Sequence, residues 1–100
     1  MIGKMTQISD EYIIDIKTAS QILKDNGCTE MYIFGSVADN NAGENSDIDI
    51  AVKGIPKSKF FKTYGKIISS INHPVDLVCL DYKNEFTDFL SKNGEMIRVF

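Results

Sequence analysis

The most informative part of the chain is SDIDIAV, residues 46–52, in which charged and apolar side chains alternate. Successive side chains of a β-strand point to opposite faces, so this alternation predicts a strand. One face would carry Asp47, Asp49 and Ala51, and the other would carry the larger apolar side chains. Aspartate is depleted in strands, which makes two aspartates on one face unusual.

Two carboxylates at positions i and i+2 lie roughly 6.5–7 Å apart along a strand. Their repulsion would be roughly 2.5 kcal/mol at an effective dielectric constant of about 20. A divalent cation is the simplest counter-charge, and oxygen ligands without nearby His or Cys favour Mg²⁺, with Mn²⁺ as the alternative. A third aspartate, Asp76, interrupts the apolar run Val75–Leu80, and only an edge strand would give it a solvated position. We therefore expect Asp47, Asp49 and Asp76 to be metal ligands.

Helical and strand-like patterns alternate along the rest of the chain. The order predicts an α+β fold of mixed α/β character, with a sheet of three to four strands and helices packed mainly on one face. Phe60, Phe61 and Tyr64 keep helical spacing and are expected in the core. The expected elements are a helix from Ser9 to Asn26, strand 31–34, a polar loop at 39–46, strand 47–52, a helix with the stripe Phe60, Phe61, Tyr64, Ile67, Ile68 and Ile71, a turn at 72–74, strand 75–80, a helix with the stripe Phe86, Phe89 and Leu90, and a short strand at 96–100.

Composition narrows the classes of function. One hundred residues of ordinary hydrophobic content indicate a single domain, residues 1–100. The net charge of −3 argues against duplex nucleic acid as a partner, because phosphate binding requires a basic surface. No transmembrane or signal-peptide run is evident, so no membrane association is expected. Cys28 and Cys79 have no metal-ligand spacing and are expected to be buried free thiols, which favours a cytoplasmic location.

A second motif precedes the aspartates. Gly35-Ser36 directly follows the apolar strand Met31–Phe34, and nine residues separate it from Ser46-Asp47-Ile48-Asp49. A glycine at a strand end allows a ligand to approach the backbone closely. Together with Asp76 on a later strand, this order of motifs resembles the DNA polymerase β-like nucleotidyltransferase superfamily. Within it, the chain is most similar to the minimal nucleotidyltransferases, the MNT proteins.

The resemblance implies a small polymerase β-like nucleotidyltransferase fold and a transfer of nucleotide, most simply AMP from ATP. It implies that Asp47 and Asp49 hold two Mg²⁺ ions and that Asp76 completes one metal site and activates the acceptor hydroxyl, as ligand or general base. It also implies that Gly35 and Ser36 bind the β- and γ-phosphates of a nucleoside triphosphate, with Ser46 among the nucleotide-binding residues.

The same resemblance implies a partner. MNT proteins are often antitoxins of helical HEPN toxins, and several transfer AMP to the toxin. The face that carries Asp76 also carries Val78 and Leu80, so we expect a partner chain, of the same or another kind, to cover it. The family often has Gly-Ser-x-Ala-Arg-Gly, whereas this chain has Asp39 in place of the arginine. This departure favours one alternative, an antitoxin that acts by binding with little or no catalysis. A further alternative is a transferase for a small molecule or nucleic acid that acts with another subunit, against which the acidic balance of the chain counts.

Overall fold

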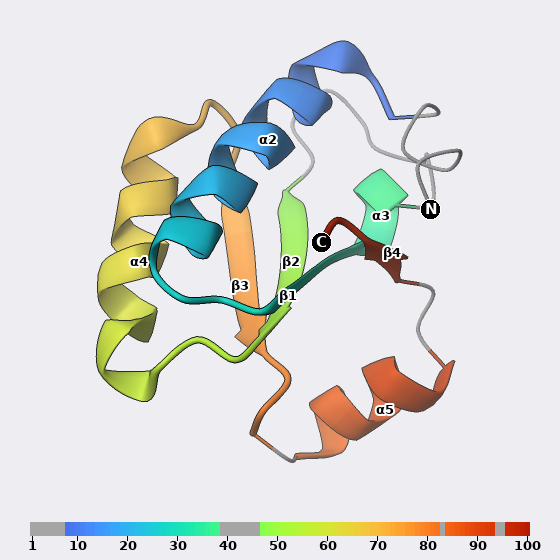
Figure 1. Cartoon of the computed structure of the whole chain (residues 1–100). Coiled ribbons are helices and arrows are strands. Elements are labelled where there is room, and N and C mark those ends of the chain that lie inside the picture. The colour runs from blue at the N-terminus through green and yellow to red at the C-terminus, as the bar shows by residue number, and fades with distance from the viewer. Residues whose placement is uncertain (1–7, 39–46, 83, 94–95) are drawn as a thin grey trace.

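The computed structural model describes residues 8–38, 47–82, 84–93 and 96–100. Helices and strands alternate along these residues in the order that the sequence predicts (Figure 1). None of the described helices is long and apolar enough to cross a membrane. The elements are α2 (Asp10–Asp25), β1 (Glu30–Phe34), the single turn α3 (Gly35–Ala38), β2 (Ile48–Lys53), α4 (Lys57–Ser70), β3 (Val75–Cys79), α5 (Glu85–Asn93) and β4 (Ile97–Arg98).

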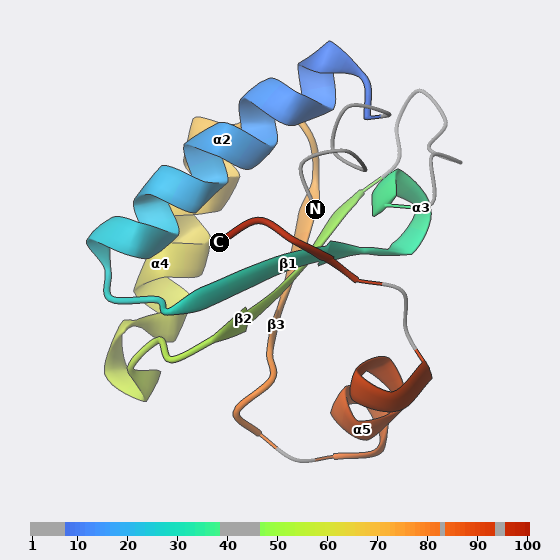
Figure 2. The ribbon, with the colours of Figure 1, turned by 45° about the vertical axis from the view of Figure 1, so that its right-hand side comes forward.

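The strands form one mixed sheet in the order β3-β2-β1-β4. Strand β1 pairs antiparallel with both β2 and β4, whereas β2 and β3 are parallel. Parallel neighbours need a crossover between them, and α4 supplies it. Helices α2 and α4 lie together on one face of the sheet and α5 lies on the other (Figure 2).

The larger core lies between the sheet and the helices α2 and α4. The alternation in β2 places its apolar side chains there, since Ile48, Ile50 and Val52 are fully buried. Helix α2 contributes a stripe of side chains at helical spacing, including Ile16 and Leu23. The opposite face has a smaller cluster of Phe34, Ala51 and Leu90, with Val78 and Leu80 packed against it. Helix α5 therefore covers part of the face that we expected a partner chain to cover.

Helix α4 corrects one expectation about the core. Phe61 is 81% exposed although it was expected in the core, and Ile68 of the same apolar stripe is 56% exposed. Consecutive residues of a helix are rotated by about 100°. The inward stripe runs through Phe60, Tyr64 and Ile67. Phe61 and Ile68 each follow a residue of this stripe and are therefore rotated away from the core.

A buried carboxylate fixes the turn between α4 and β3. Asp15 on α2 is 2% exposed, and its Oδ2 accepts hydrogen bonds from the backbone N–H groups of Asn72 and His73 at 3.0 and 3.1 Å. The Nδ1 atom of His73 lies 2.6 Å from the same oxygen. The Tyr12 ring stacks on the imidazole with centroids 4.2 Å apart. This contact ties α2 to the turn that the sequence predicts at residues 72–74.

Candidate active site at the aspartate end of the sheet

Two of the three predicted carboxylates are brought together by the parallel strand pair. Asp49 on β2 is the register partner of Asp76 on β3. Neighbouring strands lie about 4.7–4.9 Å apart, and side chains in register leave the sheet on the same face. Asp47 comes directly before β2 and is exposed. Carboxylates from two segments that are distant in sequence therefore meet at one end of the sheet.

Gly35 closes the site on the β1 side. It directly follows β1, and Phe34 of that strand is the register partner of Asp49. The φ angle of Gly35 is +74°, in the left-handed region that glycine adopts without strain. A Cβ atom built at this position would lie 2.1 Å from Oδ2 of Asp49. A side chain at this position would displace the Asp49 carboxylate from where it lies.

The side chains of the two motif serines, Ser36 and Ser46, are not described by the structure, unlike those of the aspartates. Ser46 lies outside the described residues. Ser36 belongs to the single helical turn α3, and its side chain also lies outside the described part of the structure. Their roles in phosphate binding therefore stay predictions from the sequence.

Electrostatic repulsion is concentrated on Asp49. Partial burial raises the pKa of the Asp49 carboxyl, and the negative charges of Asp76 and Asp47 raise it further. The protein thus holds like charges close to Asp49, whose carboxyl is harder to ionise there than in water. A bound cation would reverse this effect, and the oxygen donors suit Mg²⁺ or Mn²⁺.

The side chains, as they lie, do not enclose a metal ion. Among the described residues, no three His, Cys, Asp or Glu side chains form a group that could hold one. Asp76 is exposed because β3 is an edge strand. Its position is therefore the solvated one that an edge strand offers, although its neighbours in sequence are apolar. The fit to a metal rests on the adjacency of Asp49 and Asp76 and on the influence of Asp47 on Asp49.

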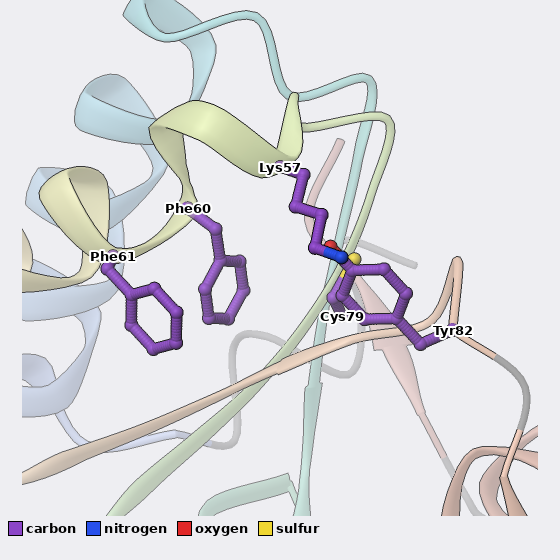
Figure 3. A pocket seen from close by; sticks show the side chains of 5 residues that line it. All are labelled: Lys57, Phe60, Phe61, Cys79 and Tyr82. Carbon is purple, nitrogen blue, oxygen red and sulfur yellow. The ribbon is translucent and has the colours of Figure 1, made fainter.

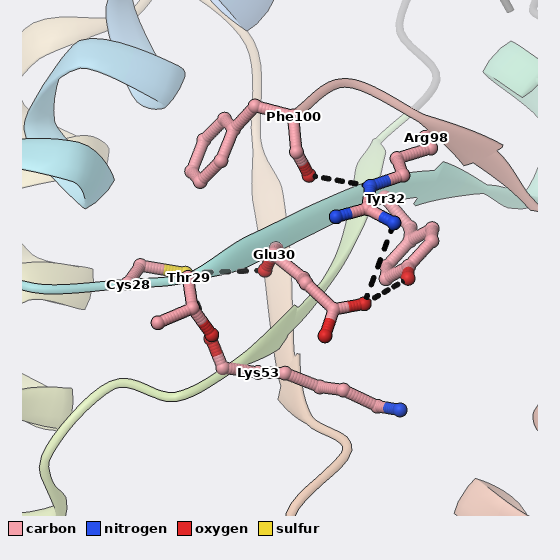
Figure 4. Close-up of polar contacts among 7 residues, drawn as sticks. All are labelled: Cys28, Thr29, Glu30, Tyr32, Lys53, Arg98 and Phe100. Carbon is pink, nitrogen blue, oxygen red and sulfur yellow. Dashed lines mark hydrogen bonds and ion pairs between the residues drawn. The ribbon is translucent and has the colours of Figure 1, made fainter.

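The single arginine of the chain lies toward the other end of β1 (Figure 4). The Nη1 atom of Arg98 is 3.9 Å from Oε1 of Glu30, and its Nε donates a hydrogen bond to the carbonyl of Phe100 at 3.1 Å. The Tyr32 hydroxyl donates to the same glutamate, and this hydrogen bond raises the pKa of Tyr32. Arg98 is therefore engaged with Glu30 and not with the aspartates.

A cavity lies apart from the aspartates. It has a volume of about 420 Å³ and is lined by side chains from α4, the end of β3 and the turn after it, with no contribution from Gly35 or the three aspartates (Figure 3). No motif of the sequence predicts this cavity. The feature of the sequence that could have indicated it is Phe61, an aromatic residue next to the buried stripe of the lysine-rich helix α4. The lining residues are Lys57, Phe60, Phe61, Cys79 and Tyr82.

Comparison with known proteins agrees with this geometry. The family model described as "Polymerase beta, Nucleotidyltransferase" matches residues 17–98. The chain belongs to this nucleotidyltransferase family. The match runs from within α2 to the end of β4, and it confirms the resemblance and the fold class that the sequence predicts.

Solved structures similar to this nucleotidyltransferase domain are toxin–antitoxin complexes. One is described as a toxin–antitoxin crystal structure with AMP-PNP; it is 26% identical, has a TM-score of 0.64, and the match covers 88% of this chain and 72% of that one. Another is described as the toxin–antitoxin MntA-HepT; it is 25% identical, has a TM-score of 0.59, and the match covers 83% and 68% of the two chains. A search of curated proteins gave no significant match.

Proposed function

We propose that this nucleotidyltransferase-fold chain is an Mg²⁺-dependent transferase that moves AMP from ATP to a hydroxyl group of a partner protein, as the antitoxin of a toxin–antitoxin pair. The observation that carries the proposal is the register of Asp49 with Asp76, with Gly35 packed against Asp49. The similarity to toxin–antitoxin structures, one of them with AMP-PNP, supports the nucleotide and the kind of partner. By the resemblance, the partner is a helical HEPN-type protein.

The positions of these residues support the following proposed roles. Asp47 and Asp49, with Asp76, would hold the metal ions, which when bound neutralise charge on the attacking and leaving oxygens. Gly35 lets the Asp49 carboxylate lie against the backbone after β1, and by the resemblance it would also bind phosphate oxygens. Asp76, on the exposed edge, would act as metal ligand or general base and, as a base, would receive the proton of an incoming hydroxyl as its oxygen bonds to the α-phosphorus and pyrophosphate leaves. Asp49, the most crowded carboxylate, gains most from a cation beside it.

The test uses the purified chain, Mg²⁺ and ATP labelled at the α-phosphate. Lysate from source cells that lack the gene supplies the acceptor. We expect one labelled protein band with the native chain and none with Asp47→Asn/Asp49→Asn. Asp88→Asn is the matched control, because it removes a charge from an exposed position on α5. A band of equal strength with the double variant would overturn the proposed mechanism.

One observation favours a second candidate, an antitoxin that neutralises its toxin by binding alone. The family's motif arginine is replaced by Asp39, and Arg98 is engaged with Glu30. Asp49→Asn separates the two candidates. Loss of protection against the toxin is expected if transfer is required, and full protection is expected if binding is sufficient.

A further inference from the structure

Strand β3 has a free side. Of the strands that the structure describes, β3 stands at the end of the sheet and pairs only with β2. The Ile48 N–H donates to the Pro74 carbonyl and the Leu80 N–H donates to the Val52 carbonyl, both at 2.8 Å. Even-numbered residues of this segment therefore turn their backbone groups toward β2. The odd-numbered residues Val75, Leu77 and Cys79 turn theirs outward.

One outward group confirms this assignment. The Val75 carbonyl accepts a hydrogen bond from the Tyr64 hydroxyl of α4 at 2.9 Å. The structure gives no such partner to the outward groups of Leu77 and Cys79, within its described residues. An edge of this kind is a template for a further strand, and proteins use it to bind extended peptide segments.

The cavity lies at the carboxyl end of the same edge (Figure 3). Phe60 and Phe61 descend from α4, and the Tyr82 ring lies across from them with Lys57 Nζ 5.7 Å from its centroid. The Cys79 side chain, on the α4 side of the sheet, completes the lining. Phe61, at 81% exposed, has no packing role in the core. The cavity therefore suits a single apolar side chain that arrives along the edge of β3.

The helix beside this cavity carries positive charge only, whereas one acidic side chain, Asp81, contacts the lining residue Cys79, with Sγ and Oδ2 3.6 Å apart. Helix α4 carries Lys57, Lys59, Lys62 and Lys66 and no aspartate or glutamate, although the net charge of the chain is −3. Asp81 is the nearest acidic residue along the chain, and its Oδ2 accepts the N–H of Gly54 at 2.8 Å. An incoming segment would therefore complement the lysines of α4 if it carried carboxylates beside the apolar residue that enters the cavity.

We propose that the β3 edge and this cavity bind an extended segment of the acceptor protein, with an apolar residue beside Cys79, flanked by carboxylates, and a hydroxyl residue beside Asp76. The two positions are three residues apart, so their side chains leave the added strand on opposite faces. The apolar one enters the cavity on the α4 side, and the hydroxyl one lies on the aspartate side. The role of the hydroxyl rests on the proposed transferase function, whereas the binding of the segment does not.

The test pans a displayed library of random nine-residue peptides on the full chain, without nucleotide or metal. Phe61→Asp serves as the counter-selection. We expect enriched peptides to share an apolar residue with an acidic neighbour and a Ser, Thr or Tyr three positions away. Phe61→Ala should weaken the binding of a selected peptide at least tenfold. Ile68→Ala, which truncates another exposed residue of α4, should change it less than twofold.

Two measurements test the strand pairing itself. Binding should slow hydrogen exchange at the N–H groups of Leu77 and Cys79, while that of Val78, which faces β2, is slow already. Alternate residues of a paired strand direct their N–H groups toward the neighbouring strand. N-methylation of the peptide residues that face β3 should therefore abolish binding, and N-methylation of the residues between them should not. Asp49→Asn should bind the peptide as well as the native chain does, so loss of labelled product in that variant would concern transfer alone. Absence of selective enrichment, unchanged exchange, or equal effects of both methylated sets would overturn the proposal.

Discussion

The Asp49 carboxylate occupies the space in which a side chain of residue 35 would stand. The nearest atom to a Cβ built on Gly35 is Oδ2 of Asp49, at 2.1 Å. Because that oxygen is the end of a side chain that can rotate, Gly35→Ala should cost only about 1 kcal/mol of stability, mostly from its positive φ. The larger effect is expected on function, since Asp49 must leave its position beside Asp76. We predict that nucleotide transfer falls at least a hundredfold, measured by label incorporation.

Gly27→Ala is the control for backbone strain. Gly27 also has a positive φ, +92°, but a Cβ there would meet only Pro56 Cδ at 3.7 Å. Its thermal midpoint should fall about as much as that of Gly35→Ala, with transfer unchanged. Equal loss of transfer in both variants would show that strain, and not the displacement of Asp49, is responsible.

Asp49→Asn should stabilise the metal-free protein at neutral pH and remove its response to Mg²⁺. Burial and the charges of Asp76 and Asp47 raise the pKa of Asp49, so the folded state holds this proton more tightly than the unfolded state. The stabilisation from protonated Asp49 is present below its ordinary pKa and is lost as the pH rises through the raised value. Native and variant midpoints should therefore diverge from acidic to neutral pH. Parallel curves would contradict this account.

Mg²⁺ provides the complementary measurement. The native chain should gain thermal stability with added Mg²⁺, because the ion binds the folded carboxylates. The Asp49→Asn variant should gain much less, and Asp88→Asn should gain as much as the native chain. A full Mg²⁺ response in Asp49→Asn would exclude Asp49 as a ligand.

Asp15→Ala should destabilise the fold by about 3 kcal/mol or more, as loss of one member of a buried pair does. The Asn72 and His73 N–H groups and the imidazole would lose their shared acceptor. Denaturant unfolding measures the change. Asp25→Ala, at an exposed position on the same helix, should stay within about 0.5 kcal/mol of the native chain.

Both cysteines should react slowly with thiol reagents at neutral pH. Burial raises the pKa of Cys28 and of Cys79, which lowers the fraction of reactive thiolate, and both residues are largely buried. The rate of modification should increase with pH and become fast in denaturant. Rapid reaction of the folded chain at pH 7 would contradict the burial of these thiols.

The sequence was sufficient for the strands but not for every helix face. Alternation in residues 47–52 predicts both the strand and its buried face, because the side-chain period of a strand leaves no ambiguity. Periodicity failed to predict the exposure of Phe61. A helical stripe with two adjacent aromatic residues does not determine which of them points to the core. The buried Asp15 was invisible for another reason: its partners, Asn72 and His73, come from a distant turn.

In the candidate site, too, local features could be predicted from the sequence and contacts between distant segments could not. The spacing of Gly35, Asp47 and Asp49 is local, and it could be matched to a family pattern. The register of Asp49 with Asp76 depends on the path of α4 over the sheet, which no local pattern encodes. The edge position of β3 likewise follows from the order of all the strands, and it explains why Asp76 is exposed.

The parallel pairing of β2 with β3 also determines when the site forms. Asp49 and Asp76 meet only after the intervening helix has folded back across the sheet, so the entropy of closing that loop is lost before any contact between the strands is gained. The two aspartates also repel each other at the moment of closure. The chain therefore acquires its carboxylate cluster at global folding and not before. Refolding followed by Mg²⁺ binding should show the same rate constant as refolding followed by far-ultraviolet circular dichroism.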